Sequence, residues 1–210
     1  PNKEVAAKFH TDFERTCELA NELGKDALTK TVRDLGFGKS VKISKAKTVR
    51  STFDVSAATK LDLGWAGIGQ STTLVNPSHF LAIMGAIANG GTGCAPDRIK
   101  ALGAVGNVVG RITETIVTIK PETASELNKL LRSNVADKYG DWKFKGLEMC
   151  GKTGTAQIDG EKSHSWFVGY SQRDDLPLAV VCIAEHGGYG SGVASTVSNK
   201  VMQYFAENLT

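Results

Sequence analysis

Gly151-Lys152-Thr153-Gly154-Thr155-Ala156-Gln157 is the stretch from which the fold of this chain can be argued, because it joins a strand-forming pattern to small and hydroxyl-bearing residues. Side chains alternate between the two faces of a strand, so Lys152 and Gly154 should face one way and the two threonines the other. Gly154 has no Cβ, which lets an extended ligand lie close to the backbone of an edge strand. A lone Lys-Thr-Gly is a weak signal, because the triplet also occurs in ordinary strands and turns.

The last third of the sequence predicts an antiparallel sheet closed by a helix. Three β-prone runs are joined by polar turns, at residues 147–157, 165–170 and 178–184. Short connections of this kind favour an antiparallel meander. A final helix, from Ser191 or Gly192 to about Leu209, should pack on this sheet.

The start of the chain predicts two helices. Glycine reaches positive φ without a Cβ clash, so Gly24 and Gly36 are expected to end helices at residues 12–23 and 26–35. Residues 37–63 lose this periodicity and are expected to form an irregular connection.

The middle of the chain predicts two more helices and some short strands. Asn76-Pro77 has the pattern of a helix start, with Asn as the cap and Pro in the first turn. That helix should bury Phe80, Leu81, Met84, Ile87 and Ala88 and end at Gly90-Gly91. Residues 98–119 should form short strands, and Pro121 should start a helix that reaches about Val135. Helices, then a sheet, then a terminal helix make an α+β arrangement.

Composition narrows the classes of function. The 210 residues carry a formal charge of +3, from 25 basic and 22 acidic residues, which is too small and too scattered to indicate a nucleic-acid partner. A local cluster of lysines is expected to be a solvated loop face: Lys39, Lys42, Lys45 and Lys47. No apolar run is long enough to span a bilayer, so we expect the chain itself to be soluble.

The four cysteines do not predict a metal site. None of them is in a Cys-x-x-Cys spacing, so zinc binding is not expected, and we expect neither a metal nor another cofactor. Four cysteines allow three disulfide pairings, among which the sequence does not choose. Cys150 and Cys182 lie in apolar strand-like runs and are expected to be small core residues.

Taken together, four segments resemble, in order and spacing, the C-terminal half of penicillin-binding proteins, the peptidoglycan D,D-transpeptidases that share a fold with the serine β-lactamases. These segments are residues 67–70 (Gly-Ile-Gly-Gln), 86–91 (Ala-Ile-Ala-Asn-Gly-Gly), 151–157 and 164–170 (His-Ser-Trp-Phe-Val-Gly-Tyr). The resemblance is close from about Gly64 to Gly169. It implies a partial β-lactamase-like fold, an antiparallel sheet flanked by helices.

The resemblance also implies the organisation of the chain and the roles of its motif. Residues 1–210 would be the C-terminal portion of a single transpeptidase domain, with a helical and irregular part at 1–63, helices with short strands at 64–146, and the active-site sheet with its helix at 147–210. Lys152 would place positive potential beside a nucleophilic serine. Thr153, Gly154 and Thr155 would bind the D-Ala-D-Ala terminus or a β-lactam, with the threonines on its carboxylate and the Thr155 N–H as half of an oxyanion hole.

Histidines are not expected to be catalytic, because the proton relay of this family uses lysine and serine. His164 and His186 are therefore interpreted as structural or exposed. The aromatic run 166–170 is interpreted as a strand that packs on its neighbours.

Two further motifs of this chemistry are missing from the sequence. Ser-x-x-Lys, which carries the nucleophile, is expected before Pro1. The literal match at residues 44–47 is rejected, because a lysine-rich loop would not bury the serine beside its base. No Ser-x-Asn is present; residues 16–18 (Thr-Cys-Glu) and residues 11–13 (Thr-Asp-Phe) are two alignments that stay open. We therefore expect this chain alone to be inactive.

The resulting hypothesis is part of a peptidoglycan transpeptidase. Its intact form would act on stem peptides and β-lactams at the extracytoplasmic face of a bacterial membrane, held by an N-terminal anchor outside this sequence, without a nucleic-acid partner. A homodimer is possible through exposed core surface. The alternatives are a non-catalytic β-lactam or peptidoglycan sensor module and, less favoured, a β-lactamase-like hydrolase.

Overall fold

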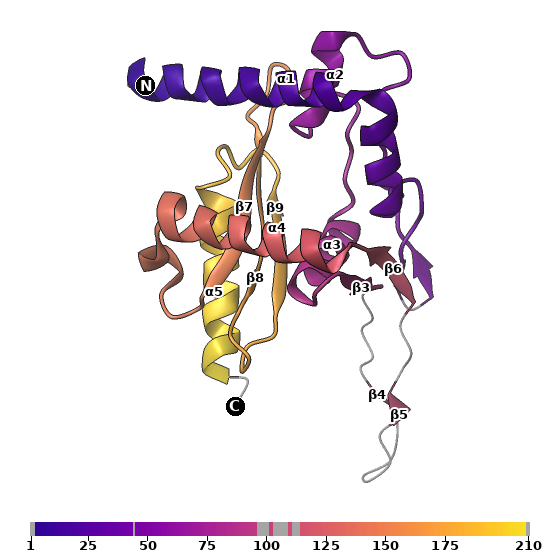
Figure 1. Ribbon diagram of the computed structural model, residues 1–210. Coiled ribbons are helices and arrows are strands. Elements are labelled where there is room, and N and C mark those ends of the chain that lie inside the picture. Colours follow the sequence, from indigo (N-terminus) through magenta and orange to yellow (C-terminus); the bar gives the residue numbers. More distant parts are fainter. Residues whose placement is uncertain (1–2, 44, 96–100, 103–108, 111–113, 209–210) are drawn as a thin grey trace. The chain divides into compact units, whose positions relative to one another are not determined.

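A computed structural model describes residues 3–43, 45–95, 101–102, 109–110 and 114–208, and the side chains of residues 14–43, 45–95 and 114–208 among them (Figure 1). The chain forms two compact units. The first unit comprises Pro1–Ser40 and Val49–Val75, and the second comprises Val41–Thr48 and Asn76–Thr210. The helices and small antiparallel sheets confirm the predicted α+β class.

The first unit is built on the helix α1 (Lys3–Asp34), which is interrupted where the sequence predicts a helix end. Gly24 has φ 79° and ψ 167°, so two helical segments meet there, and Gly36 also has positive φ at 93°. The predicted pair of helices is confirmed, although the first begins at Lys3 rather than near residue 12.

A short helix, α2 (Lys60–Gly67), overturns part of the irregular segment expected at residues 37–63. Thr59 and Asp62 form a capping box, in which the Asp62 N–H donates to Thr59 Oγ1 at 3.2 Å and the Thr59 N–H donates to Asp62 Oδ2 at 2.9 Å. This capping box favours a helix here although the surrounding residues are mostly polar. Contact with α1 requires a small residue, since a Cβ on Gly64 would lie 2.7 Å from Cys17 Sγ.

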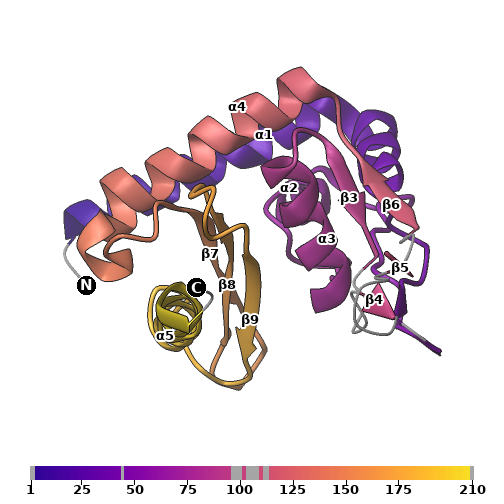
Figure 2. The same ribbon diagram turned by 90° about the horizontal axis from the view of Figure 1, so that it is seen from below.

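The second unit is centred on a three-stranded antiparallel sheet in the order β7 (Met149–Ala156), β8 (His164–Ser171) and β9 (Ala179–Ala184). The predicted meander is confirmed. Helix α5 (Val193–Asn208) lies on one face of the sheet and helix α3 (Pro77–Ala88) on the other (Figure 2). The side chain of Asn76 caps α3 by accepting the Ser78 N–H at 2.9 Å, as its sequence predicts.

Helix α3 buries a different set of side chains from the predicted one. Its buried residues are His79, Ala82, Ile83, Met84, Ala86 and Ile87. Met84 and Ile87 were correctly placed, whereas Ala88 is exposed and Phe80 and Leu81 are half-buried. The helix is packed over a wider arc than a simple amphipathic stripe predicts, because β3, β8 and β9 all contact it.

The main core lies between the sheet and α5. It is completed by the π-helix Asn134–Gly140, which continues α4 (Pro121–Ser133), and by the 3-10 helix Asp141–Phe144. The Phe144 and Phe167 rings stack with centroids 5.1 Å apart, and the cluster also contains Val135, Leu147, Met149, Leu176, Ala194 and Met202. The predicted helix from Pro121 is confirmed, and its continuation as a π-helix was not predicted.

Three pairs of short strands complete the described residues. They are β1 (Lys42–Ile43) with β2 (Ala46–Lys47), β3 (Thr92–Cys94) with β6 (Thr115–Thr118), and β4 (Ala101–Leu102) with β5 (Val109–Gly110). Short strands were expected at residues 98–119; β3 and the pair β1–β2 were not. Lys39, Lys42, Lys45 and Lys47 are exposed as predicted.

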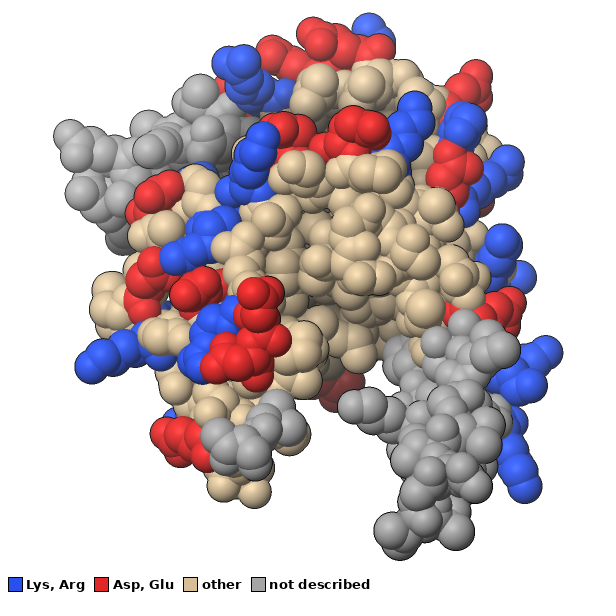
Figure 3. Space-filling model, turned by 60° about the horizontal axis from the view of Figure 1, so that its bottom comes forward, with Lys and Arg blue, Asp and Glu red and all other residues tan. Residues whose placement is uncertain are grey.

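The cysteines and the charges agree with the sequence-based expectations. All four cysteines are free, with Cys150 buried and Cys182 half-buried against the main core. On the face shown in Figure 3, acidic and basic side chains are intermixed around a broad central area that carries no charged side chains. None of the helices in the described part of the chain has the length and apolar character that crossing a membrane requires.

Candidate functional site

The Lys-Thr-Gly stretch lies on β7, which is an edge strand of the sheet within the described residues. Its register places Gly154 opposite Trp166 and Thr155 opposite Ser165 on β8. The contacts of Thr153 and Thr155 lie on the α5 side, whereas Trp166, opposite Gly154, contacts Phe80 of α3 with ring centroids 6.4 Å apart. The alternation inferred from the sequence is therefore present.

Lys152 is exposed at this edge. Its Nζ donates a hydrogen bond to the carbonyl oxygen of Thr153 at 2.6 Å. The ammonium group is thus held against the strand, where it gives positive potential to anything that approaches the edge.

Thr153 is bound by a side chain from outside the motif. The hydroxyl of Tyr139, on the π-helix, lies 3.2 Å from the Thr153 main-chain N and 3.1 Å from Thr153 Oγ1. Tyr139 is half-buried and packs against the main core. This contact was not predictable from the sequence, since the two residues lie on different elements and a π-helix has no simple sequence signal.

Thr155 is contacted by the loop between β9 and α5. The Gly190 N–H donates to Thr155 Oγ1 at 3.2 Å. The loop passes so close to β7 that a Cβ on Gly190 would lie 2.3 Å from the Gly154 carbonyl oxygen. The glycine-rich sequence of residues 187–192 was a signal that could have identified this approach.

Ser165 holds this loop in place. Its hydroxyl is fully buried, donates to the Tyr189 carbonyl at 2.9 Å and accepts the Ala194 N–H at 3.1 Å. Ala194 is in the first turn of α5, where main-chain N–H groups have no partner within the helix. One serine on β8 therefore fixes both the loop and the start of the helix.

A buried polar cluster fixes the start of β7 against α4. Asn128 Oδ1 accepts the Tyr170 hydroxyl at 2.6 Å and lies 3.5 Å from Cys150 Sγ. Burial raises the pKa of the Cys150 thiol to about 11 and also raises the pKa of Tyr170. Arg132 adds a hydrogen bond from Nη1 to the Met149 carbonyl at 3.0 Å. The Cys150 thiol, the Tyr170 phenol and the Arg132 guanidinium are therefore protonated at neutral pH, and they support the strand.

The two histidines lie near the turn of the β7–β8 hairpin, where His164 pairs with Ala156. His186 is exposed and His164 half-buried, with ring centroids 5.1 Å apart, and the His186 N–H donates to His164 Nδ1 at 3.0 Å. Within the described residues, no group of three or more His, Cys, Asp or Glu side chains could hold a metal ion.

One of the two alignments for the missing Ser-x-Asn motif has side chains that the structure describes. Thr16, Cys17 and Glu18 are on α1 in the first unit, and the Cys17 side chain packs against Gly64. The side chains of residues 11–13, and Ser44 of the rejected match, lie outside the described residues. Within the second unit, the described residues bring the Lys-Thr-Gly element together with Tyr139 and Gly190.

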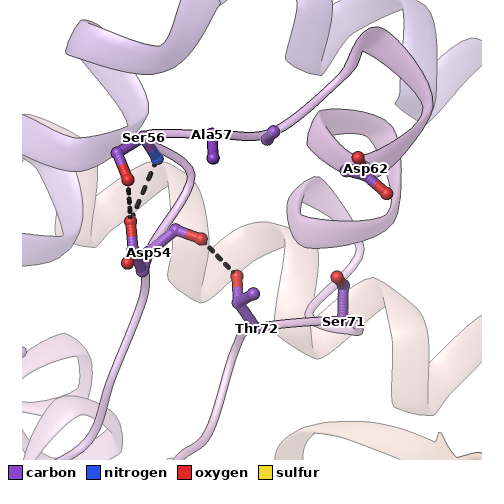
Figure 4. Close-up of a pocket in the computed structure, with 7 residues that line it drawn as sticks. Asp54, Ser56, Ala57, Asp62, Ser71 and Thr72 are labelled. Carbon is purple, nitrogen blue, oxygen red and sulfur yellow. Dashed lines mark hydrogen bonds between the residues drawn. The ribbon is translucent and has the colours of Figure 1, made fainter.

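A polar depression in the first unit is a weaker candidate (Figure 4). It has a volume of about 280 Å³ and is lined by Asp54, Ser56, Ala57, Ala58, Asp62, Ser71 and Thr72. Asp54 Oδ1 accepts both the N–H and the hydroxyl of Ser56, at 3.0 and 2.7 Å, and these bonds lower the pKa of Asp54. Because Asp62 is likewise engaged by Thr59, both carboxylates serve local structure.

Comparison with known proteins matches this sequence to one family. The family model described as penicillin binding protein transpeptidase domain matches residues 16–203. Stage V sporulation protein D of Bacillus subtilis is 30% identical over 89% of this chain and 31% of its own length. Peptidoglycan D,D-transpeptidase MrdA of Haemophilus influenzae is 24% identical over 97% of this chain and 36% of its own length.

Solved structures share the fold. The D,D-transpeptidase domain of a peptidoglycan glycosyltransferase from Eggerthella lenta aligns with a TM-score of 0.77 at 22% identity, over 94% of this chain and 52% of that one. Penicillin-binding protein A of M. tuberculosis, solved as an imipenem acyl-enzyme complex, aligns with a TM-score of 0.76 at 23% identity, over 89% and 43%. The chain spans between 26% and 36% of the length of the curated relatives it matches.

Proposed function

The chain belongs to the penicillin-binding protein transpeptidase domain family, and on that premise we propose that its second unit carries the ligand-binding strand of a peptidoglycan D,D-transpeptidase. The observation that carries this proposal is the edge strand β7, where two threonine hydroxyls share one face beside a lysine ammonium group. Hydroxyl donors beside a positive charge suit a carboxylate, which accepts several hydrogen bonds. The terminal carboxylate of a D-Ala-D-Ala peptide, or that of a β-lactam, has this chemistry.

Each residue of the motif has a proposed role. Thr153 and Thr155 bind the carboxylate, and Gly154 leaves room for the ligand backbone beside the strand. Lys152 contributes the positive potential that stabilises a serine alkoxide and its acylation transition state. The Thr155 N–H is half of an oxyanion hole, a type of donor whose loss costs about 10²–10³ in rate.

The reaction of the whole protein is a broader proposal. We propose that residues 1–210 are the C-terminal portion of one transpeptidase domain, and that the nucleophilic serine belongs to a part of the domain that this sequence does not include. In the longer protein, the serine attacks the carbonyl between the two D-alanines, releases the terminal D-alanine and forms an acyl-enzyme. The amine of a second stem peptide then attacks this ester and forms the cross-link at the extracytoplasmic face of the membrane.

Binding without acylation is the test of the role proposed for this chain. A ¹⁵N-labelled sample titrated with benzylpenicillin should show shifts at residues 152–155, and Thr153→Val with Thr155→Val should remove them. A fluorescent penicillin should leave no covalent label on the chain. Unchanged spectra at high ligand concentration would contradict the ligand-binding role, and a labelled band would contradict the assignment of the nucleophile to another segment.

A sensor module is the second candidate, favoured by the absence of a Ser-x-Asn from the sequence. It predicts ligand binding in the longer protein without acylation. Acylation there that is lost on Lys152→Ala supports the transpeptidase instead. A β-lactamase-like hydrolase remains the weaker alternative and predicts turnover of the β-lactam.

Self-association is a separate proposal about the second unit. Helix α5 exposes an apolar stripe at helical spacing, formed by Val193, Val197, Val201, Tyr204 and Phe205. A second copy of the chain could cover such a stripe. Sedimentation velocity should then show a dimer that Val197→Lys dissociates, and a monomer at every concentration would exclude it.

A further inference from the structure

The hydroxyl of each threonine in the motif is contacted by a group from outside the motif. We propose that Tyr139 and the main-chain N–H of Gly190 are positioning groups, which aim the hydroxyls of Thr153 and Thr155 at the terminal carboxylate of a D-Ala-D-Ala peptide. This inference rests on the function proposed above. It adds the residues that would make β7 selective for a free carboxylate.

Tyr139 fixes Thr153 by two contacts at once. Its hydroxyl oxygen accepts the Thr153 main-chain N–H at 3.2 Å and lies 3.1 Å from Thr153 Oγ1. The main-chain bond holds the edge of the strand, and the second bond selects one rotamer of the threonine. Because Tyr139 is itself packed against the main core, the phenol is a rigid support for this rotamer.

The proton count of this pair favours an acceptor ligand. Tyr139 and Thr153 each carry one hydroxyl proton, and the hydrogen bond between their oxygens uses one of the two. The other proton can be donated outward, whichever residue holds it. An oxygen that accepts hydrogen bonds and donates none, as in a carboxylate, matches this arrangement.

Gly190 performs the corresponding task for Thr155. Its N–H donates to Thr155 Oγ1 at 3.2 Å, which fixes the side-chain rotamer with the oxygen already serving as an acceptor. This bond depends on the absence of a side chain at residue 190. A Cβ there would lie 2.3 Å from the carbonyl oxygen and 2.7 Å from the nitrogen of Gly154, so any other residue displaces the loop from the strand.

A carboxylate and its amide should therefore be distinguished at this site. The outward hydroxyl proton of the Tyr139–Thr153 pair and the hydroxyl proton of Thr155 can be donated to the two oxygens of a carboxylate, a charge-assisted arrangement that is stronger than neutral hydrogen bonds. A C-terminal amide offers one oxygen, and its NH₂ group is a donor that competes with the hydroxyl protons. The ratio of the two affinities measures how well the hydroxyls are aimed.

The experiment compares N-acetyl-D-Ala-D-Ala with its C-terminal amide, both titrated into the ¹⁵N-labelled chain. The wild-type chain should prefer the free acid, and Tyr139→Phe and Gly190→Ala should each lower this preference on the order of threefold to tenfold. Tyr204→Phe changes an exposed tyrosine on α5, and Gly85→Ala adds a Cβ with no atom within 4 Å. Both control variants should keep the wild-type preference.

A purely structural role gives a different result. If Tyr139→Phe weakens the acid and the amide by the same factor, or leaves the preference unchanged, the positioning role is wrong while the proposed function stands. If the wild-type chain binds neither peptide nor benzylpenicillin, the proposed function fails and this inference fails with it.

Hydrogen exchange tests the Tyr139 contact without a ligand. The Thr153 amide should exchange at least about tenfold faster in Tyr139→Phe, because the variant removes its acceptor. The Val168 amide, on the central strand, should keep its wild-type rate, which shows that the sheet is intact. An unchanged rate at Thr153 would overturn the contact, and Gly190→Ala remains an independent test of the loop.

Discussion

Replacing Asn128 by leucine should destabilise the second unit through the buried cluster that joins α4 to β7. The Asn128 Oδ1 atom accepts from the Tyr170 hydroxyl at 2.6 Å, from Gln172 Nε2 at 3.1 Å and from Cys150 Sγ at 3.5 Å. Leucine has a similar volume and no acceptor. The variant therefore removes one acceptor from three donors.

The cost depends on which donors water can reach. Gln172 is exposed, so water replaces its lost bond at little cost. Tyr170 is 2% exposed and keeps only the Cys150 thiol, a weak partner, and a buried hydroxyl without an adequate partner costs about 1–3 kcal/mol. The Cys150 thiol is a weak donor that also lies 3.7 Å from the Asn128 carbonyl, and its share is small. We expect a loss of about 2 kcal/mol in the free energy of unfolding.

Urea denaturation with a double-mutant cycle measures this effect. Tyr170→Phe alone should cost about 1 kcal/mol, and combining it with Asn128→Leu should cost less than the sum, since no hydroxyl is then stranded. Asn199→Leu is a control, because the side-chain contact of Asn199 with Gln203 is long at 3.4 Å. A loss below about 0.5 kcal/mol for Asn128→Leu, or strict additivity, would refute the argument from the stranded donor.

Three further predictions concern the core, the thiol and the helix break. Phe167→Ala removes a fully buried ring that stacks on Phe144, and should cost about 3–5 kcal/mol in urea unfolding; a loss under about 1 kcal/mol would mean that the core closes over the gap. Burial raises the pKa of Cys150 from 9.0 to about 11, so its contribution to stability is fully present below pH 9 and disappears as the pH rises through 11. The urea midpoint should fall over that interval, and Cys150→Ala should reduce the fall; an equal fall in the variant contradicts this assignment. Gly24 has φ 79° and ψ 167°, a backbone region essentially restricted to glycine, with open space around its Cα, so Gly24→Ala and Gly24→Asn should each lower stability by about 1–3 kcal/mol through backbone strain alone. Thermal unfolding of both variants measures the two losses, and a loss under about 0.5 kcal/mol in either variant would contradict the argument from backbone strain.

The elements with local signals were predictable from the sequence. Gly24 ends a helical segment because it adopts positive φ, and Asn76-Pro77 starts α3 because the Asn side chain caps the Ser78 N–H. The three strands of the sheet follow from their apolar runs and short turns. In each case the stabilising groups lie within a few residues of one another.

The features that the sequence did not predict depend on tertiary contacts. Tyr139 meets Thr153 from a π-helix, and Gly190 meets Thr155 across 35 residues of chain. Neither contact can be predicted from the periodicity of apolar residues, because each depends on how a loop or an irregular helix packs against the folded sheet. The motif was therefore recognisable from the sequence, whereas the groups that orient its side chains were not.

The hydroxyl of Ser165 determines which parts of the second unit can move independently. It is bound at once to the Tyr189 carbonyl and to the Ala194 N–H, and its residue pairs with Thr155 in the ladder. Because of these two hydrogen bonds, the loop can move away from β7 only if the first turn of α5 unfolds at the same time. Separation of the Gly190 loop from β7 is thus coupled to unwinding at the start of the C-terminal helix. The main-chain amides freed by the two events should therefore share one hydrogen-exchange rate.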